Sequence, residues 1–227
     1  MKGIKHIFFD LDHTLWDYDR SAQETLTDIY DRFHLSEATT IKKFVSAFYT
    51  VNNELWHLYN SGEIHRDYIK KYRFEKILSA VGADISFSGE ASDYFISTCS
   101  TKPYLMPDAL TALHYLSGRY ELHIITNGFL DSQGRKLGSS GIDKFFKVMV
   151  TSECADSRKP AAEIFHHSLR QASAGIHESV MIGDNPRTDI QGAKDVGLKT
   201  VFYDPSGKRR SLADFTIQSH MELIKIF

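Results

Sequence analysis

The second part of the chain alternates between short apolar runs and amphipathic stretches. Beyond Lys102-Pro103, strands are predicted at 121–126, 146–151, 179–183 and 199–203, and helices at 107–118, 131–140, 161–173 and 187–196. Such alternation is typical of a parallel β-sheet with helices on both faces. It predicts an α/β fold built on a doubly wound, mainly parallel sheet.

One further strand is predicted far upstream of this series. Residues 4–10 form an apolar run, and they are separated from the rest of the alternation by about 80 residues with a helical pattern. The predicted helices in that block cover 20–33, 38–60, 65–81 and 89–100. The sequence therefore predicts an α/β core, residues 1–18 and 101–227, that carries an inserted all-α cap domain, residues 19–100.

Composition excludes several other classes of protein. The net charge of −2 argues against a nucleic-acid polymer as partner, and no apolar run reaches the length of a membrane span. Cys99 and Cys154 lie far apart, which favours a reducing, cytoplasmic location without disulfides. The eleven histidines show no repeated ligand spacing, so the sequence predicts no histidine metal site.

Polar residues gather where the predicted strands end. The first strand ends at Asp10, with Asp12 two residues later, and the second ends at Thr126-Asn-Gly128. Lys159-Pro160 follows the third strand, and the fourth leads into Gly183-Asp-Asn-Pro-Arg-Thr-Asp189. Ligands bind at the carboxyl ends of strands in open parallel sheets. These four segments are therefore expected to form one site.

The residue types at this site suit phosphoryl transfer. Clustered carboxylates need a cation, and hard oxygen ligands favour Mg²⁺. Asp10 can attack phosphorus to form an aspartyl-phosphate, and Asp12 can move the protons if its surroundings raise its pKa. Lys159 would offset the phosphate charge, while Thr126 would donate a hydrogen bond. Any one of these motifs alone is commonly a turn or a helix cap.

Taken together and in this order, the four segments resemble the signature motifs of the haloacid dehalogenase (HAD) superfamily, which has a Rossmann-like core. The resemblance implies that Asp10 is the nucleophile and Asp12 the general acid and base. It implies Mg²⁺ as the cofactor, held by Asp10, the backbone carbonyl of Asp12 and Asp184, with Asp189 supporting these ligands from behind. It also implies that phosphate is bound by Thr126, Asn127 and Lys159.

Asp12 favours a phosphatase within this superfamily. By resemblance, dehalogenases lack an acid at that position, because they protonate no alkoxide. Residues 51–64, 72–74 and 126–129 are similar to the YjjG-type branch of pyrimidine 5'-nucleotidases. This similarity implies a small phosphorylated metabolite as substrate, such as a nucleoside monophosphate, chosen by the cap domain. Trp56 and Tyr59 receive no role, since aromatic residues at helical spacing are more often core.

Two other functions remain open from the sequence. The first is a sugar phosphomutase of the same superfamily, which would return the phosphate to its sugar. The second is a non-enzymatic binding module, whose expected mark is the loss of a nucleophile or metal ligand, although Asp10 and Asp184 are both present. No pattern predicts an oligomeric state.

Overall fold

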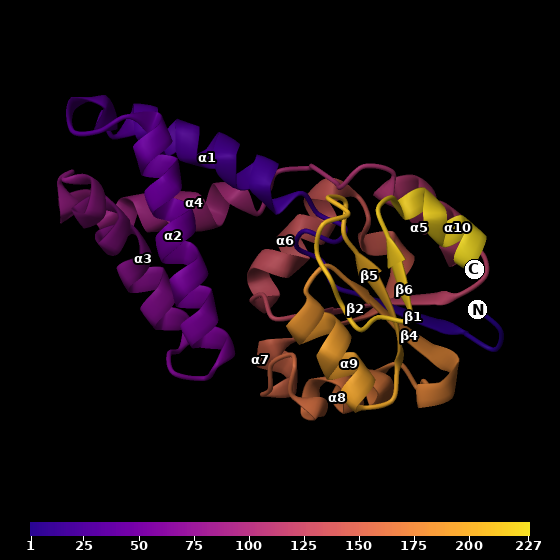
Figure 1. The fold of residues 1–227 in the computed structure, drawn as a ribbon. Coiled ribbons are helices and arrows are strands. Elements are labelled where there is room, and N and C mark those ends of the chain that lie inside the picture. The colour runs from indigo at the N-terminus through magenta and orange to yellow at the C-terminus, as the bar shows by residue number, and fades with distance from the viewer. The chain divides into compact units, whose positions relative to one another are not determined.

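The computed structural model describes all residues, 1–227. The chain forms two compact units. One comprises Met1–Tyr18 together with Pro103–Phe227, and the other is Asp19–Lys102. The first unit holds the sheet, whereas the second is built from helices alone (Figure 1).

A six-stranded sheet forms the centre of the first unit, in the order β3-β2-β1-β4-β5-β6. The strands are β1 (His6–Phe9), β2 (Glu121–Thr126), β3 (Phe146–Thr151), β4 (Ser179–Gly183), β5 (Lys199–Tyr203) and β6 (Phe215–Ile217). All neighbouring pairs are parallel. The predicted doubly wound α/β sheet is therefore confirmed, with every strand parallel. The strand order reverses between β1 and β4, which makes this the expected place for a ligand crevice.

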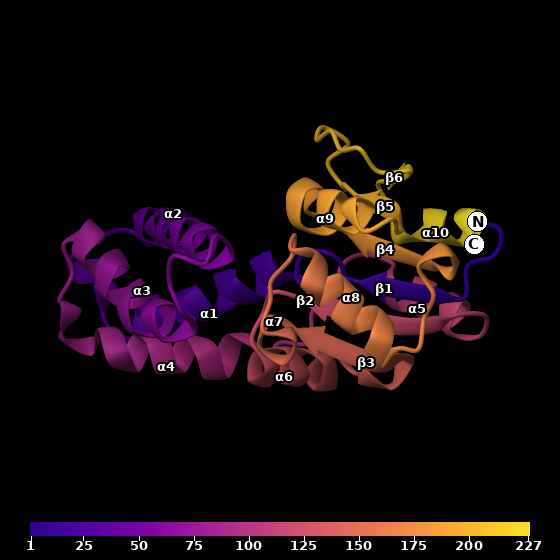
Figure 2. The same ribbon diagram turned by 90° about the horizontal axis from the view of Figure 1, so that it is seen from below.

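Helices cover both faces of the sheet. They are α5 (Ala109–Ser117), α6 (Leu130–Ser140), α7 (Ser152–Ala155), α8 (Ala162–Gln171), α9 (Gly192–Asp195) and α10 (Leu223–Ile226). On one face α8 and α9 enclose a buried core in which Phe165 and Ala193 pack with Phe8, Ile125 and Met181 of the strands. The helices α5 and α10 lie on the other side of the sheet, above the strands in Figure 1 and behind β1 in the case of α5 in Figure 2.

Several elements of this unit differ from the sequence prediction. The strand β6 and the short helices α7 and α10 were not predicted. The expected helix over 187–196 is a π-helical segment, Pro186–Gln191, followed by the short α9. In the π-helical segment the Ile190 amide reaches five residues back to the Asn185 carbonyl, at 3.2 Å. Such turns often occur at functional sites.

The helical unit contains α1 (Tyr18–Arg32), α2 (Ile41–Asn60), α3 (Arg66–Val81) and α4 (Ser88–Cys99). Its buried centre is aromatic, because Phe48, Phe74 and Phe95 meet with ring centroids 5.0–6.2 Å apart. Thr40 caps the start of α2 by accepting from the Lys43 amide. No helix in the chain combines the length and the apolar character that crossing a membrane requires.

Candidate active site at the carboxyl end of the sheet

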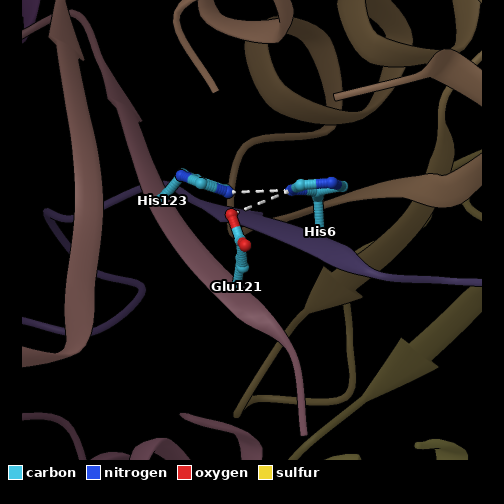
Figure 3. Close-up of side chains that lie close together, drawn as sticks. All are labelled: His6, Glu121 and His123. Carbon is cyan, nitrogen blue, oxygen red and sulfur yellow. Dashed lines mark hydrogen bonds and ion pairs between the residues drawn. The ribbon is translucent and has the colours of Figure 1, made fainter. Parts of the chain in front are cut away.

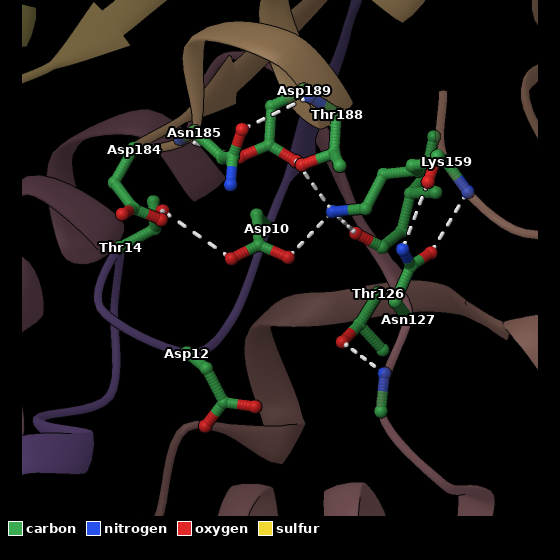
Figure 4. Close-up of polar contacts among 12 residues, drawn as sticks. Asp10, Asp12, Thr14, Thr126, Asn127, Lys159, Asp184, Asn185, Thr188 and Asp189 are labelled. Atoms are coloured by element: carbon green, nitrogen blue, oxygen red, sulfur yellow. Dashed lines mark hydrogen bonds and ion pairs between the residues drawn. The ribbon is translucent and has the colours of Figure 1, made fainter. Parts of the chain in front are cut away.

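The predicted site residues come together where the strand order reverses (Figure 4). Asp10 directly follows β1, and its amide donates to the Ile182 carbonyl of β4 at 2.9 Å. Thr126 ends β2 on the other side of β1, and Asp184 directly follows β4. Parallel pairing of β1 with both neighbours thus brings the ends of three chain segments to one edge.

The buried side chain of Lys159 bridges two of the carboxylates at this site, those of Asp10 and Asp189. Its ammonium contacts Asp10 Oδ1 at 2.6 Å, Asp189 Oδ1 at 2.7 Å and the Ile125 carbonyl at 2.9 Å. The side chain is 2% exposed, so these three partners replace water for all three N–H groups. Burial alone would lower the pKa of Lys159, but Asp10 and Asp189 hold it above its ordinary range. The lysine is therefore a fixed positive charge.

The negative charge at this edge exceeds what one lysine can balance. Oxygens of Asp10, Asp184 and Asp189 lie within 4.8 Å of one another. Burial raises the pKa of Asp10 to about 8, against the opposing effect of Lys159. Burial, together with Asp189, raises the pKa of Asp184 to about 7. Thr14 lies between the two, with its hydroxyl 3.5 Å from Asp10 and 3.3 Å from Asp184.

These raised pKa values indicate how well the cluster fits a metal ion. Carboxylates that resist ionisation when surrounded only by protein become ionised when a cation is added. The donor set of Asp10 and Asp184 consists of hard carboxylate oxygens, which suit Mg²⁺ better than softer metals. The residues present therefore fit a divalent cation of this class.

Asp12 lies apart from the cluster and has partners of its own. The ammonium of Lys136 contacts its two carboxylate oxygens at 2.6 and 2.8 Å, and the Gln133 amide donates to it at 2.9 Å. Burial alone would raise the pKa of Asp12, but Lys136 and Gln133 hold it below its ordinary range. A general acid would need a raised pKa, so in this structure the surroundings of Asp12 shift its pKa away from what the role predicted for it requires.

The two predicted phosphate ligands after β2 are also engaged with protein groups. Thr126 Oγ1 accepts hydrogen bonds from the Gly128 amide at 3.1 Å and from Gln133 at 3.0 Å. The side-chain amide of Asn127 donates to the Lys159 carbonyl at 2.9 Å and accepts from the Lys159 amide at 2.8 Å. In this geometry Asn127 fixes the backbone that carries Lys159.

The loop after β4 sets the position of Asp189. The Asn185 side chain accepts from two amides, those of Arg187 and Thr188, and so caps the π-helical segment. The Asn185 amide in turn donates to Asp189 Oδ2 at 3.0 Å. Asp189 packs directly over Gly183, where any Cβ would overlap its carboxylate. A close approach of this kind requires glycine at position 183.

Gly183→Ala is therefore expected to displace Asp189 and weaken its contact with Lys159. Overpacking should cost about 1–3 kcal/mol of unfolding free energy and lower catalytic activity. Gly138→Ala on the exposed side of α6 is the matched control, because no atom lies within 4 Å of its added Cβ. Denaturant unfolding of both variants tests this. Equal stabilities for the two would contradict it.

Several residues at the site were not singled out from the sequence, among them Gln133, Lys136 and Arg209. Gln133 and Lys136 lie three residues apart on α6, a spacing that places both on one helix face. Arg209 contacts Asp184 twice, at 3.0 Å through the carbonyl and 3.6 Å through the carboxylate, and is itself held by Asp204. The helical spacing after Thr126-Asn-Gly128 could have pointed to the first two, whereas no signal pointed to Arg209.

The chain is similar to known hydrolases and phosphatases. The family model of haloacid dehalogenase-like hydrolases matches residues 4–197. The chain is 30% identical to the pyrimidine 5'-nucleotidase YjjG of Escherichia coli K12, over 86% of this chain and 83% of the relative. It is 29% identical to a glyceraldehyde 3-phosphate phosphatase of Pyrococcus furiosus, over 100% and 94%.

A solved structure of similar fold is that of the putative HAD-hydrolase YfnB from Bacillus subtilis, which is bound to magnesium. It superimposes with a TM-score of 0.90, covers 99% of both chains and is 23% identical. At this identity the likeness concerns the fold. The match includes the helical unit as well as the sheet, since nearly the whole chain is covered.

Proposed function

The chain belongs to the haloacid dehalogenase-like hydrolase family, and we propose that it is a Mg²⁺-dependent phosphomonoester hydrolase with Asp10 as nucleophile. One observation carries the proposal. A buried carboxylate at the end of the central strand is held 2.6 Å from a fully buried lysine, with Asp184 beside it. This combination supports the proposal, because a carboxylate able to attack phosphorus, a positive charge and further carboxylate oxygens lie at one point.

The reaction proceeds in two displacements. An oxygen of Asp10 attacks phosphorus, and the bond from phosphorus to the ester oxygen breaks, which leaves an aspartyl-phosphate and an alkoxide. Asp12 gives its proton to the alkoxide. A water molecule then loses a proton to Asp12 and attacks phosphorus, which releases orthophosphate and restores Asp10. Lys159 offsets the negative charge that gathers around phosphorus in both steps.

The metal would be held by Asp10, by Asp184 and by the backbone carbonyl of Asp12, with Asp189 and Lys159 fixing the first carboxylate. When bound, Mg²⁺ supplies positive charge that neutralises phosphate oxygens and lets an anionic nucleophile approach. Arg209 steadies Asp184 through its backbone and its carboxylate.

Mg²⁺ is expected to stabilise the protein more strongly as the pH rises. Burial raises the pKa of Asp10 to about 8 and of Asp184 to about 7, so a cation must displace protons from them at lower pH. For each proton that must be displaced, the free energy of Mg²⁺ binding becomes less favourable by about 1.4 kcal/mol for each pH unit below the pKa of the group. In metal-free protein, such raised pKa values lower stability as pH rises from about 4 to about 8, and Mg²⁺ removes this loss.

Melting temperatures measured with and without Mg²⁺ between pH 5 and 8 test this. In Asp184→Asn, most of the rise in melting temperature that Mg²⁺ causes should be lost. A Mg²⁺ effect that is independent of pH, or unchanged in that variant, would contradict the assignment of these ligands.

Lys136 and Gln133 contact the Asp12 carboxylate and favour its ionised form, whereas the proposed mechanism needs Asp12 to carry a proton before the first step. Because Lys136 lowers the pKa of Asp12, Lys136→Met should raise it and move the basic limb of the kcat/KM profile upward by about one pH unit. An alkyl phosphate is the appropriate substrate, since its leaving group needs the proton. Lys147→Met, which changes an exposed lysine of β3, is the control. An unmoved basic limb would show that Lys136 does not tune Asp12.

The proposed substrates are nucleoside monophosphates, with pyrimidine nucleotides first, and the helical unit Asp19–Lys102 makes the choice. The support is the similarity to YjjG, while the second relative acts on a phosphorylated three-carbon sugar. Orthophosphate release from a panel of nucleotides and sugar phosphates tests the proposal. A kcat/KM at least tenfold higher for sugar phosphates would overturn the nucleotide assignment. Isomerised sugar phosphate without orthophosphate release would overturn the hydrolase assignment in favour of a mutase.

A further inference from the structure

A second cluster of side chains that could hold a metal ion is drawn in Figure 3. It lies near the amino ends of β1 and β2, whereas Asp10 and Asp184 follow the carboxyl ends of their strands. It consists of His6 at the start of β1 and of Glu121 and His123 on β2. The parallel register pairs His6 with Glu121, and His123 follows two residues later on the same strand. Side chains two residues apart point to the same face, so the sheet itself sets the spacing of the three.

We propose that His6, Glu121 and His123 bind a divalent transition metal ion of the Zn²⁺ class. His6 Nδ1 lies 3.2 Å from His123 Nε2 and 3.7 Å from Glu121 Oε2. One ligand atom from each residue can be chosen so that all three lie within 4.8 Å of one another. Bonds of about 2.0–2.1 Å in a tetrahedral site place two nitrogens about 3.3 Å apart, which the histidine pair already satisfies.

The carboxylate is the ligand that would have to move, and it is the one able to do so. The side chain of Glu121 is 56% exposed, whereas that of His6 is 10% exposed and His123 is fully buried. The two imidazoles are therefore fixed by packing, and His123 stacks on Phe8 with ring centroids 4.7 Å apart. A rotation of the exposed glutamate closes the site without disturbing the core, and water completes the coordination.

The second nitrogen of His6 also faces a carboxylate. His6 Nε2 lies 3.9 Å from Glu178 Oε1, as is usual for a histidine that binds metal. The 3.2 Å between His6 Nδ1 and His123 Nε2 fits a hydrogen bond as well as a shared metal ion, and Glu121 on the same face offers the further ligand that a metal site requires.

The choice of metal follows from the ligands. Imidazole nitrogens favour Zn²⁺, Cu²⁺ or Ni²⁺, whereas the catalytic cluster offers only oxygens and favours Mg²⁺. The two sites can therefore be studied separately, with Mg²⁺ in excess to fill the catalytic one. The proposal stands independently of the proposed phosphatase function.

Equilibrium dialysis of the full chain against Zn²⁺, with Mg²⁺ in excess, tests the proposal. We expect one Zn²⁺ per chain, with affinity reduced about tenfold or more in Glu121→Gln and His6→Gln. His166→Ala, on the exposed side of α8, should bind as the unchanged protein does. Co²⁺ in place of Zn²⁺ should give the strong visible absorption of a four-coordinate ion, and Glu121→Gln should remove it.

Two outcomes would overturn the proposal. The first is the absence of stoichiometric Zn²⁺ binding to the unchanged protein. The second is binding that survives Glu121→Gln and His6→Gln but disappears in Asp184→Asn, which would place the ion on the catalytic carboxylates. Because Glu121→Gln should retain full Mg²⁺-dependent hydrolysis, a failure here is distinguishable from a failure of the proposed phosphatase.

Discussion

Asp10→Asn is expected to lower Mg²⁺-dependent phosphate-ester hydrolysis by about four orders of magnitude or more, because an amide cannot form the aspartyl-phosphate. The fold should survive this change. Burial raises the pKa of Asp10 to about 8, so a neutral side chain of the same shape removes a charge that the interior already disfavours. Lys159 keeps Asp189 and the Ile125 carbonyl as partners.

Turnover of an aryl phosphate and denaturant unfolding should be measured on the same samples. Asp143→Asn, at an exposed position before β3, is the matched control and should retain full activity. Acid quenching of the unchanged enzyme during turnover, followed by peptide mass spectrometry, should find the phosphoryl group on the peptide that contains Asp10. Near-normal turnover by Asp10→Asn, or a phosphoryl group on another residue, would refute the mechanism.

The sequence was enough to predict that the candidate site residues lie close together, because this depends only on where the strands end and on their parallel direction. Asp10, Thr126 and Asp184 each end or follow a strand, and all strands are parallel. Their ends therefore share one edge whatever the details of packing. Sequence alone did not establish that β1 lies between β2 and β4, which is what brings these three segments next to one another.

The protonation of Asp12 could not be predicted, because it depends on how α6 is rotated about its axis. The rotation of α6 directs Gln133 and Lys136 at Asp12, and it places the Lys136 ammonium 4.6 Å from the centre of the Trp16 ring. A carboxylate after a predicted strand does not indicate whether the helix that packs against it carries a charged side chain at the point of contact. Amphipathic spacing indicates that a helix has an inner face, but it does not indicate which loop that face covers.

The differences at β6 and at the π-helical segment have physical reasons. β6 is an edge strand of three residues, with Phe215 45% exposed, which is too short for an alternating pattern to be recognised. The π-helical segment keeps the polar and apolar spacing of a helix. Its wider turns are visible in the bonds that reach five residues back, from the Ile190 amide to the Asn185 carbonyl and from the Gly192 amide to the Arg187 carbonyl.

Lys159→Met is expected to cost about 3–5 kcal/mol of unfolding free energy at neutral pH, in addition to abolishing activity. The variant leaves Asp10 and Asp189 buried without the ammonium that lies 2.6 and 2.7 Å from them. Burial raises the pKa of Asp10, and Lys159 is the largest effect that opposes this rise. Without the lysine, the pKa of Asp10 in the folded state rises still further above its value in the unfolded chain, so the variant keeps losing stability to a higher pH than the unchanged protein does.

The loss relative to the unchanged protein should therefore grow as the pH rises above about 8, where Asp10 ionises in the unchanged protein but stays protonated in the variant. Lys194→Met is the matched control, because Lys194 pairs with Asp214 at 3.2 Å while both side chains are about one-third exposed. A surface pair of this kind contributes about 0–1 kcal/mol. Urea unfolding at several pH values compares the two. Similar losses for the two variants, or a loss for Lys159→Met that does not grow with pH, would mean that Lys159 does not act as the buried counter-charge of the nucleophile.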